Sequence, residues 1–194
     1  MNFGRFPSYE TFLKELEAFH GKMAPGGVLG LQMVNLAWEL LPKGILVDII
    51  CETRKCLADA IQLLTPCTMG NHWLKIVDTG RFAAVFYDKQ TGEGVRISLD
   101  MEEMKRHVAI NEWFLKLVPK KEQNLQAILD EINQAGASLF NHCPVTVDPE
   151  VLKVRPKVPS VICPGCKEAY PPFHGTLCRG CQGATEAYYH RSLK

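Results

Sequence analysis

The sequence predicts an α+β fold, in which a core of helices packs on an antiparallel sheet, followed by a small separate module at the C-terminus. Helical spacing of apolar residues recurs in several segments, and short β-branched runs are joined by glycine-containing turns. Four of the eight cysteines lie after residue 160, downstream of a proline-rich stretch. A chain of 194 residues, 46% of them hydrophobic and 22% charged, suits one globular domain with an appendage.

Two helices are expected at the start of the chain. Residues 9–20 carry apolar side chains at helical spacing, with Ser8 available as the cap and Gly21 as the stop. Residues 24–42 form a second helix with a broad apolar face, and Pro25 suits its first turn.

Strand and helix patterns alternate in the middle of the chain. The β-branched run over residues 44–51 predicts a buried strand, and residues 54–65 predict a helix that ends before Pro66. Two further helices are expected over residues 101–117 and 122–136. Three strands with glycine-containing turns between them should form an antiparallel meander: residues 72–78, 82–88 and 94–99.

The composition changes near residue 141, where prolines become frequent and the helical period is lost. We therefore expect a core domain over residues 1–143, an extended linker over 144–159 and a four-cysteine module over 160–194. Residues 151–194 hold seven Lys and Arg against two Glu, although the whole chain has a net charge of only +1. The C-terminal part is thus basic and the rest is acidic.

Several classes of protein are excluded. No apolar stretch approaches the roughly 20 residues of a membrane span, and the N-terminus lacks the basic and apolar segments of a secretory signal. We therefore expect a cytoplasmic protein with no membrane partner. In a reducing compartment, eight cysteines indicate metal sites or reactive thiols more than disulfides. Neither a dinucleotide-binding glycine motif nor a P-loop is present.

Two C-x-x-C pairs form the strongest candidate site, Cys163 with Cys166 and Cys178 with Cys181. Each pair places two sulfurs on one tight turn, and two such turns complete the tetrahedral set that structural zinc prefers. The alternatives are a redox dithiol pair or a disulfide. A segment this small needs a staple, which favours one structural zinc per chain. A short helix expected after Cys181 indicates a treble-clef finger rather than a zinc ribbon, and His174 is expected in a loop.

The basic charge of this module raises the question of nucleic acid. Four thiolates with one Zn²⁺ remove about two of the positive charges. Because no stacking platform or recognition helix is evident, the sequence favours a structural or protein-interaction role over nucleic-acid binding.

A weaker candidate site lies in the core. Cys56 falls in the first turn of a predicted helix beside two cations, where we expect a thiolate. Asp59 shares its helix face, and His20 ends the first helix. If the loops meet, His20, Cys56 and Cys67 form a mixed nitrogen and sulfur pocket suited to zinc or another late transition metal.

Each of these residues also has a structural interpretation. Free cysteine is among the most buried residue types, so Cys51 on its apolar strand is expected in the core. A single His such as His20 is commonly a hydrogen-bonded cap residue, and Asp59 near a helix start interacts favourably with the helix dipole.

Four stretches of the chain are distinctive: FHGKMAPGGVLG, CETRKCLADAIQLLTPCTMGN, LKIVDTGRFAAVFYD and GEGVRI. Together, over residues 6–99, the chain resembles the FmdE family of formylmethanofuran dehydrogenase proteins, and its four-cysteine tail is similar to the zinc finger that some members carry. The resemblance implies an α+β core with an auxiliary treble-clef finger, usually assembled as a homodimer. It also implies association, in some members, with a molybdenum- or tungsten-pterin enzyme that fixes carbon dioxide onto methanofuran during methanogenesis.

The resemblance also implies a cleft near His20, Cys56 and Cys67. Many members carry a second His and a Cys where this chain has Lys22 and Ala24, so two possible ligands are missing. A partial site or a reactive thiol then becomes the better expectation. His72 stands where a small residue is common in the family and is not expected to be a ligand.

Three functions follow as hypotheses, and whether the chain is an enzyme stays open. The first is a metal-binding accessory protein or subunit of a molybdenum- or tungsten-dependent formylmethanofuran dehydrogenase-type system in one-carbon metabolism. The second is a stand-alone enzyme in which Cys56 or Cys67 is a nucleophile or metal ligand and His20 or Asp59 an acid or base. The third is a zinc-finger module that binds another protein.

Overall fold

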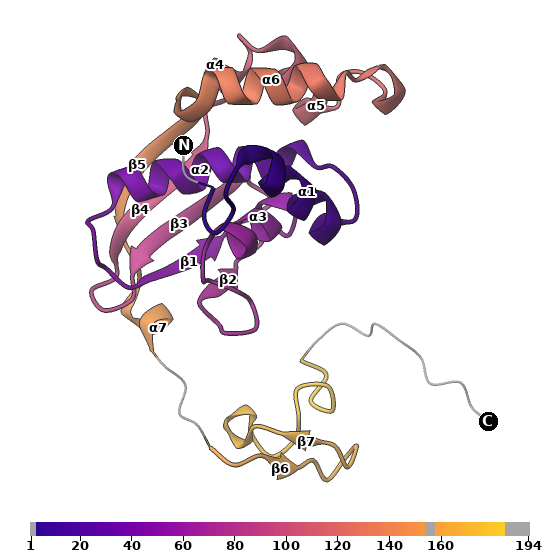
Figure 1. Ribbon diagram of the computed structural model, residues 1–194. Coiled ribbons are helices and arrows are strands. Elements are labelled where there is room, and N and C mark those ends of the chain that lie inside the picture. The colour runs from indigo at the N-terminus through magenta and orange to yellow at the C-terminus, as the bar shows by residue number, and fades with distance from the viewer. Residues whose placement is uncertain (1–2, 154–157, 185–194) are drawn as a thin grey trace, which may run out of the picture. The chain divides into compact units, whose positions relative to one another are not determined.

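The computed structural model describes residues 3–153 and 158–184. The chain divides into two compact units, Met1–Leu152 and Lys153–Lys194, which are described separately. The first unit contains the sheet and most of the helices, coloured from indigo to orange in Figure 1. Within the described part of the chain, no helix combines the length and the apolar character needed to cross a membrane.

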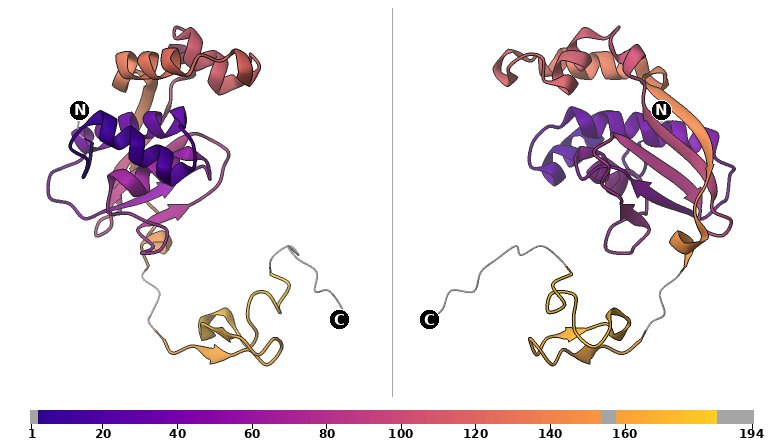
Figure 2. Two further views of the ribbon diagram at one scale, coloured as in Figure 1. Left: turned by 45° about the vertical axis from the view of Figure 1, so that its right-hand side comes forward. Right: turned by 180° about the vertical axis from the view of Figure 1, so that it is seen from behind.

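Three helices lie together on one face of the sheet (Figures 1 and 2): α1 (Tyr9–His20), α2 (Pro25–Leu40) and α3 (Cys56–Leu64). As predicted, Ser8 caps α1 by accepting a hydrogen bond from the amide of Thr11, and Gly21 ends the helix with a φ of 83°. Helices α2 and α3 approach closely at Gly30, where an added Cβ would lie 2.4 Å from the Cβ of Ala60. A bare backbone at this point therefore sets the distance between the two helices.

The sheet has five strands in the order β2-β1-β3-β4-β5, and seen from behind its strands face the viewer (Figure 2). The strands are β1 (Val47–Cys51), β2 (Leu74–Ile76), β3 (Ala83–Asp88), β4 (Glu93–Leu99) and β5 (Phe140–Thr146). The α+β class is confirmed, but the sheet is mixed rather than antiparallel. The expected meander is wrong at β2, which pairs in parallel with β1 and not with β3. The reason is that α3 carries the chain across the sheet between β1 and β2, as parallel pairing requires.

After β4 the chain forms a second group of helices. The single helix expected over residues 101–117 is instead split into α4 (Met101–Met104) and α5 (Val108–Leu115). The side chain of Glu131 accepts a hydrogen bond from the amide of Ile110 at 3.0 Å and so caps the start of α5 from a distant position. The remaining elements are η1 (Lys120–Glu122), α6 (Leu125–Ala135) and η2 (Gly136–Leu139).

Strand β5 occupies the beginning of the segment that we expected to be a linker. It pairs with β4 in antiparallel register from Phe140 opposite Leu99 to Thr146 opposite Glu93. Pro144 is tolerated because β5 is the edge strand, where one side of the backbone needs no ladder bond. The short helix α7 (Pro149–Leu152) then ends the first unit.

The second unit contains a two-stranded antiparallel sheet of β6 (Val161–Ile162) and β7 (Ala169–Tyr170). It is followed by η3 (Pro172–His174), so that His174 lies in a turn as expected. The helix predicted beyond Cys181 falls largely on residues 185–194, which lie outside the described residues.

Candidate functional site

The end of α1 and the start of α3 bring three of the candidate residues together. His20 is the last residue of α1, and Cys56 is the first residue of α3. The Nδ1 atom of His20 lies 2.6 Å from Oδ2 of Asp59, and its Nε2 atom lies 3.7 Å from Sγ of Cys56. The imidazole therefore lies between a carboxylate and a thiol.

This geometry sets the role of each nitrogen of His20. A carboxylate accepts hydrogen bonds, so Nδ1 carries the proton that is donated to Asp59. The Nε2 atom is then left as an acceptor for the thiol proton of Cys56. The same carboxylate would stabilise the imidazolium that forms if the thiol proton moves to His20. The arrangement can thus generate a thiolate beside its own counter-ion.

The thiol of Cys56 is protonated in the resting protein. Burial is the largest influence and raises its pKa, and the Asp59 carboxylate raises it further. The backbone amide at the helix start and the cations Lys22 and Lys55 lower the pKa by less. The expectation of a resting thiolate is therefore wrong, because desolvation outweighs the helix start and the cations. Cys56 consequently depends on His20 for its activation.

Gly26 provides the space in which Cys56 lies. It is the second residue of α2, and an added Cβ would lie 3.1 Å from Cβ and 3.3 Å from Sγ of Cys56. Neither α2 nor α3 has a side-chain cap at its start, where the cap residues are Ala24 and Lys55. The thiol is therefore held between the starts of two helices.

A cleft of about 860 Å³ opens beside Cys56 and His20. One wall consists of the end of α1 and the starts of α2 and α3. The other wall runs from the end of α5 through η1 to the start of α6 and includes Trp113, Leu117 and Ile128. A cavity of this size is typical of sites that take a small organic molecule. Sequence reasoning missed the second wall, because the strand pattern separates it from His20 and Cys56 along the chain.

The other core cysteines lie elsewhere. Cys51 is fully buried in β1 and donates a hydrogen bond to the carbonyl of Thr53, as its predicted core position implies. Cys67 is also fully buried and donates to the carbonyl of Val47, at the opposite end of β1. Burial raises the pKa of each of these two thiols to about 11. The structure thus brings His20 to Cys56 but directs Cys67 toward the start of β1.

Two residues that sequence reasoning missed hold the turn before Cys56 in place. Glu52 follows β1 directly, is buried, and accepts two hydrogen bonds from the guanidinium of Arg96, at 2.6 and 2.9 Å. Arg81 adds a third cationic contact at 3.1 Å. These bonds, led by that of Arg96, hold the pKa of Glu52 below its usual value. A lone acid immediately after a buried strand was the available sequence signal.

The four cysteines of the second unit form a compact cluster. Their Sγ atoms all lie within 4.8 Å of one another, and those of Cys166 and Cys178 are 3.7 Å apart. Tetrahedral zinc with bonds of about 2.3 Å requires sulfurs roughly 3.8 Å apart, so the spacing fits this ion. Among residues 3–153 and 158–184, this is the one group of three or more such side chains placed to hold a metal.

Backbone amides and neighbouring sulfurs act on these thiols in opposite directions. The amide of Cys178 donates to Sγ of Cys163 at 3.4 Å and lowers the pKa of Cys163 to about 6. Neighbouring sulfurs, first that of Cys178, raise the pKa of Cys181 to about 12. Four adjacent thiolates repel one another, and a bound divalent cation removes this repulsion. Zinc held by this set would supply a structural cross-link with no open coordination position.

Comparison with known proteins agrees with this architecture. A family model described as "FmdE, Molybdenum formylmethanofuran dehydrogenase operon" matches residues 19–145, which is more than half of the chain. The chain belongs to the FmdE family. A second model, described as "FmdE treble clef zinc finger", matches residues 155–190 and agrees with the predicted finger type.

Two relatives extend the comparison. An FmdE-like protein of Syntrophus aciditrophicus, described as belonging with the tungsten formylmethanofuran dehydrogenases, has a solved structure with 46% identity and a TM-score of 0.81. The likeness covers 96% of this chain and all of that chain. A probable S-adenosyl-L-methionine-binding protein of Archaeoglobus fulgidus is 30% identical over 122 residues. That match covers 57% of this chain, which spans about a third of the length of the Archaeoglobus protein.

The positions at which this FmdE-family chain departs from the expected ligand pattern both line the cleft. Lys22 and Ala24 lie between α1 and α2, beside His20 and Cys56. An ammonium group and a methyl group cannot replace an imidazole and a thiol as metal ligands. A metal in the core, bound through His20 and Cys56, stays a prediction.

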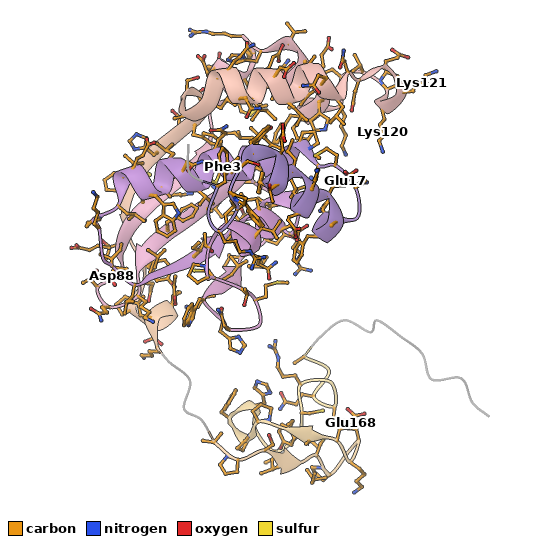
Figure 3. All side chains as sticks on the ribbon, viewed as in Figure 1. Phe3, Glu17, Asp88, Lys120, Lys121 and Glu168 are labelled. Carbon is orange, nitrogen blue, oxygen red and sulfur yellow. The ribbon has the colours of Figure 1, made fainter. Side chains whose placement is uncertain are left out.

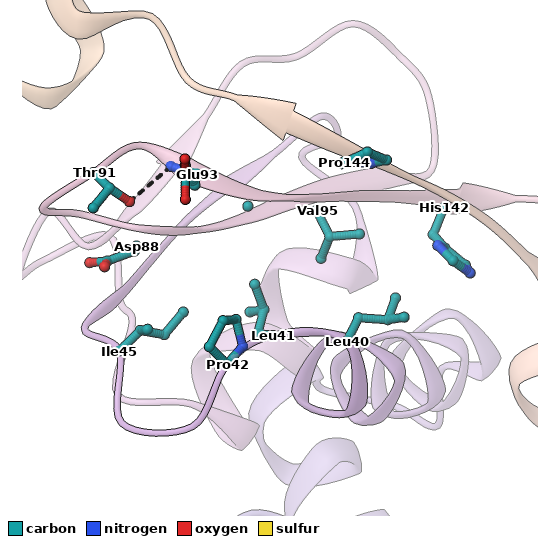
Figure 4. Close-up of a pocket in the computed structure, with 11 residues that line it drawn as sticks. Leu40, Leu41, Pro42, Ile45, Asp88, Thr91, Glu93, Val95, His142 and Pro144 are labelled. Atoms are coloured by element: carbon teal, nitrogen blue, oxygen red, sulfur yellow. Dashed lines mark hydrogen bonds between the residues drawn. The ribbon is translucent and has the colours of Figure 1, made fainter.

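A second hollow of about 410 Å³ lies between the end of α2 and strands β3 to β5 (Figure 4). Leu40, Leu41 and Ile45 face Val95 and His142 across it. Because no cysteine lines it and its walls are mainly aliphatic, it offers less chemistry than the cleft beside Cys56.

Proposed function

We propose that this protein is a metal-binding accessory protein or subunit of a molybdenum- or tungsten-dependent formylmethanofuran dehydrogenase-type system in one-carbon metabolism. The observation that carries this proposal is the likeness to the Syntrophus FmdE-like protein, which extends over both units at 46% identity. In this role the finger holds one structural zinc ion per chain through Cys163, Cys166, Cys178 and Cys181. The finger supplies an interaction surface, and the core supplies the cleft.

Affinity purification from the native cell tests the proposal. The tagged full-length protein should recover a large oxidoreductase subunit together with molybdenum or tungsten. A chain with Cys163→Ser serves as the matched control, because loss of the finger should reduce recovery if the finger contacts the partner. Repeated recovery of the protein alone, under mild conditions, would contradict the proposal.

A second function is favoured by one observation, the contact of Cys56 with His20 and of His20 with Asp59. We propose that the core acts as a thiol-dependent enzyme on a small substrate. Sγ of Cys56 attacks an electrophilic carbon as its proton moves to Nε2 of His20, and Asp59 holds the imidazole in place.

Thiol labelling tests this second function. Near neutral pH, iodoacetamide should alkylate Cys56 faster than the fully buried Cys51 and Cys67. His20→Asn should slow labelling of Cys56 about tenfold, because the base that accepts its proton is removed. His72→Asn is the matched control, since His72 is exposed and lies outside the cleft. Peptide mass spectrometry gives the rate at each cysteine, and equally slow labelling of all three would exclude the nucleophile.

Two further expectations stay predictions. The family resemblance implies a homodimer, which the molar mass from light scattering would test. A role of the finger in binding other proteins, and a cytoplasmic location, are likewise proposed from the sequence.

A further inference from the structure

The ionisable side chains that line the cleft are unevenly chosen. Apart from His20 and Cys56, they are three lysines, Lys22, Lys116 and Lys120, and no Asp or Glu belongs to the lining. Within the described residues, none of the three has an acidic partner at ion-pair distance. The cleft therefore has a positive lining that the protein does not neutralise itself.

One of these lysines is held in an uncommon backbone conformation. Lys116 ends α5 with a φ of 58°, in the left-handed region that glycine or asparagine usually fills. Its amide is bonded to the carbonyls of Glu112 and Trp113, so the helix end itself is satisfied. A lysine at this position keeps a cation in the lining where glycine would suit the backbone better.

The same wall offers apolar surface that the fold leaves uncovered. Leu117 is 60% exposed and Leu125 is 44% exposed, and both line the cleft with Trp113. Each apolar side chain that a ligand covers would contribute favourably to binding. The lining thus combines an apolar body site with a set of cations, and Lys22 is close enough to Cys56 to act on its thiol.

We propose that this cleft binds a small organic anion with an apolar body. Its carboxylate or phosphate group is held among Lys22, Lys116 and Lys120, and its body packs on Trp113 and Leu117. The inference rests on the second proposed function for the position of the thiol, and it names the class of ligand that would reach that thiol.

A pair of alkylating reagents that differ in charge tests the sign of the cleft. Iodoacetate and iodoacetamide transfer similar groups, but only iodoacetate is an anion. The ratio of their rates at Cys56 should exceed that for neutral N-acetylcysteinamide about threefold at low salt, because cations raise the local concentration of anions. In about 1 M salt, where the Debye length is about 3 Å, the two ratios should converge. Equal ratios at low salt would overturn the proposal.

Charge-removing variants locate the effect. Lys22→Gln, Lys116→Asn and Lys120→Gln together should bring the ratio at Cys56 down to that of the free thiol. Lys121→Gln is the matched control, because Lys121 is the next residue of η1 but lies outside the lining, and Figure 3 shows it pointing away from the helix that carries Glu17. The rate with neutral iodoacetamide in each variant shows that the site is still folded. An equal effect of Lys121→Gln and Lys120→Gln would contradict the assignment.

Ligands of matched length test the apolar body. Octanoate should slow the alkylation of Cys56 by iodoacetamide, whereas octylamine at the same concentration should not. Equal protection by octylamine would overturn the anion preference. These outcomes are separate from the thiol enzyme hypothesis, because that hypothesis depends on the response to His20→Asn and not on the charge of the reagent.

Discussion

Replacing Cys163 with serine should remove the metal from the C-terminal unit and unfold it, while the core stays folded. The described part of this unit has two strands of two residues each, and its buried side chains are Cys163 and Tyr170. So small a core cannot offset the entropy of ordering the chain. Zinc binding to sites of this kind contributes about 10–16 kcal/mol near neutral pH, so loss of one ligand should cost most of the stability of the unit.

Metal analysis and NMR spectra of the full-length protein measure this effect. The zinc content should fall from about one ion per chain to none, with loss of dispersed signals from the C-terminal unit alone. Cys143→Ser is the matched control, because Cys143 is an exposed cysteine of β5 outside the cluster. Full metal content in Cys163→Ser, or an ordered finger in wild-type protein that contains no metal, would contradict the prediction. Cys56→Ser measured alongside shows whether the core binds a second metal.

The finger could be predicted from the sequence because its chemistry is local. Each C-x-x-C pair is complete within four residues, so the ligand set does not depend on distant packing. The same holds for α1, whose limits follow from Ser8 and Gly21. Strand β2 was misplaced because local patterns do not say which neighbour a strand joins. The split between α4 and α5 was missed because Glu131, far along the chain, caps α5.

The core site was predicted in its residues but not in its chemistry. The sequence singled out His20, Cys56 and Asp59, yet the contact between His20 and Asp59 joins residues 39 apart and depends on how α1 packs on α3. The thiolate expectation counted the nearby cations of the sequence but not the burial that opposes them. Arg54, one of those cations, instead pairs with Asp78. Burial and three-dimensional neighbours decide a pKa, and neither can be taken from a short stretch of sequence.

Replacing Arg96 with methionine should destabilise the core by about 3 kcal/mol, because Glu52 would be left buried without its main partner. This value lies at the lower end for a broken buried pair, since Arg96 is 24% exposed and Arg81 remains near Glu52. Urea unfolding followed by tryptophan fluorescence reports on the core, where all three tryptophans lie. Arg54→Met is the matched control, because its pair with Asp78 is exposed and should contribute less than about 1 kcal/mol.

A second variant and a pH series separate the ion pair from general disruption. Glu52→Gln in the Arg96→Met background should recover part of the lost stability, because no buried charge is then left unpaired. The folded-state pKa of Glu52 is lowered, mainly by its hydrogen bonds to Arg96. The pair's contribution to stability should therefore be complete above the unfolded-state pKa of about 4.3 and disappear as the pH falls through the lower folded-state value. A stability difference between wild type and Glu52→Gln that stays constant into acid would contradict this account.

The same substitution should reach the thiol without touching it. Glu52 is bonded through its backbone to Ala83 and Thr79, and it precedes the turn that starts α3 at Cys56. Loss of Arg96 should loosen this turn and lengthen the contact between Cys56 and His20, so that alkylation of Cys56 loses its dependence on His20 under conditions where the core is still folded. If His20→Asn slows labelling equally in the wild-type and Arg96→Met backgrounds, then Arg96 stabilises the core without positioning the thiol.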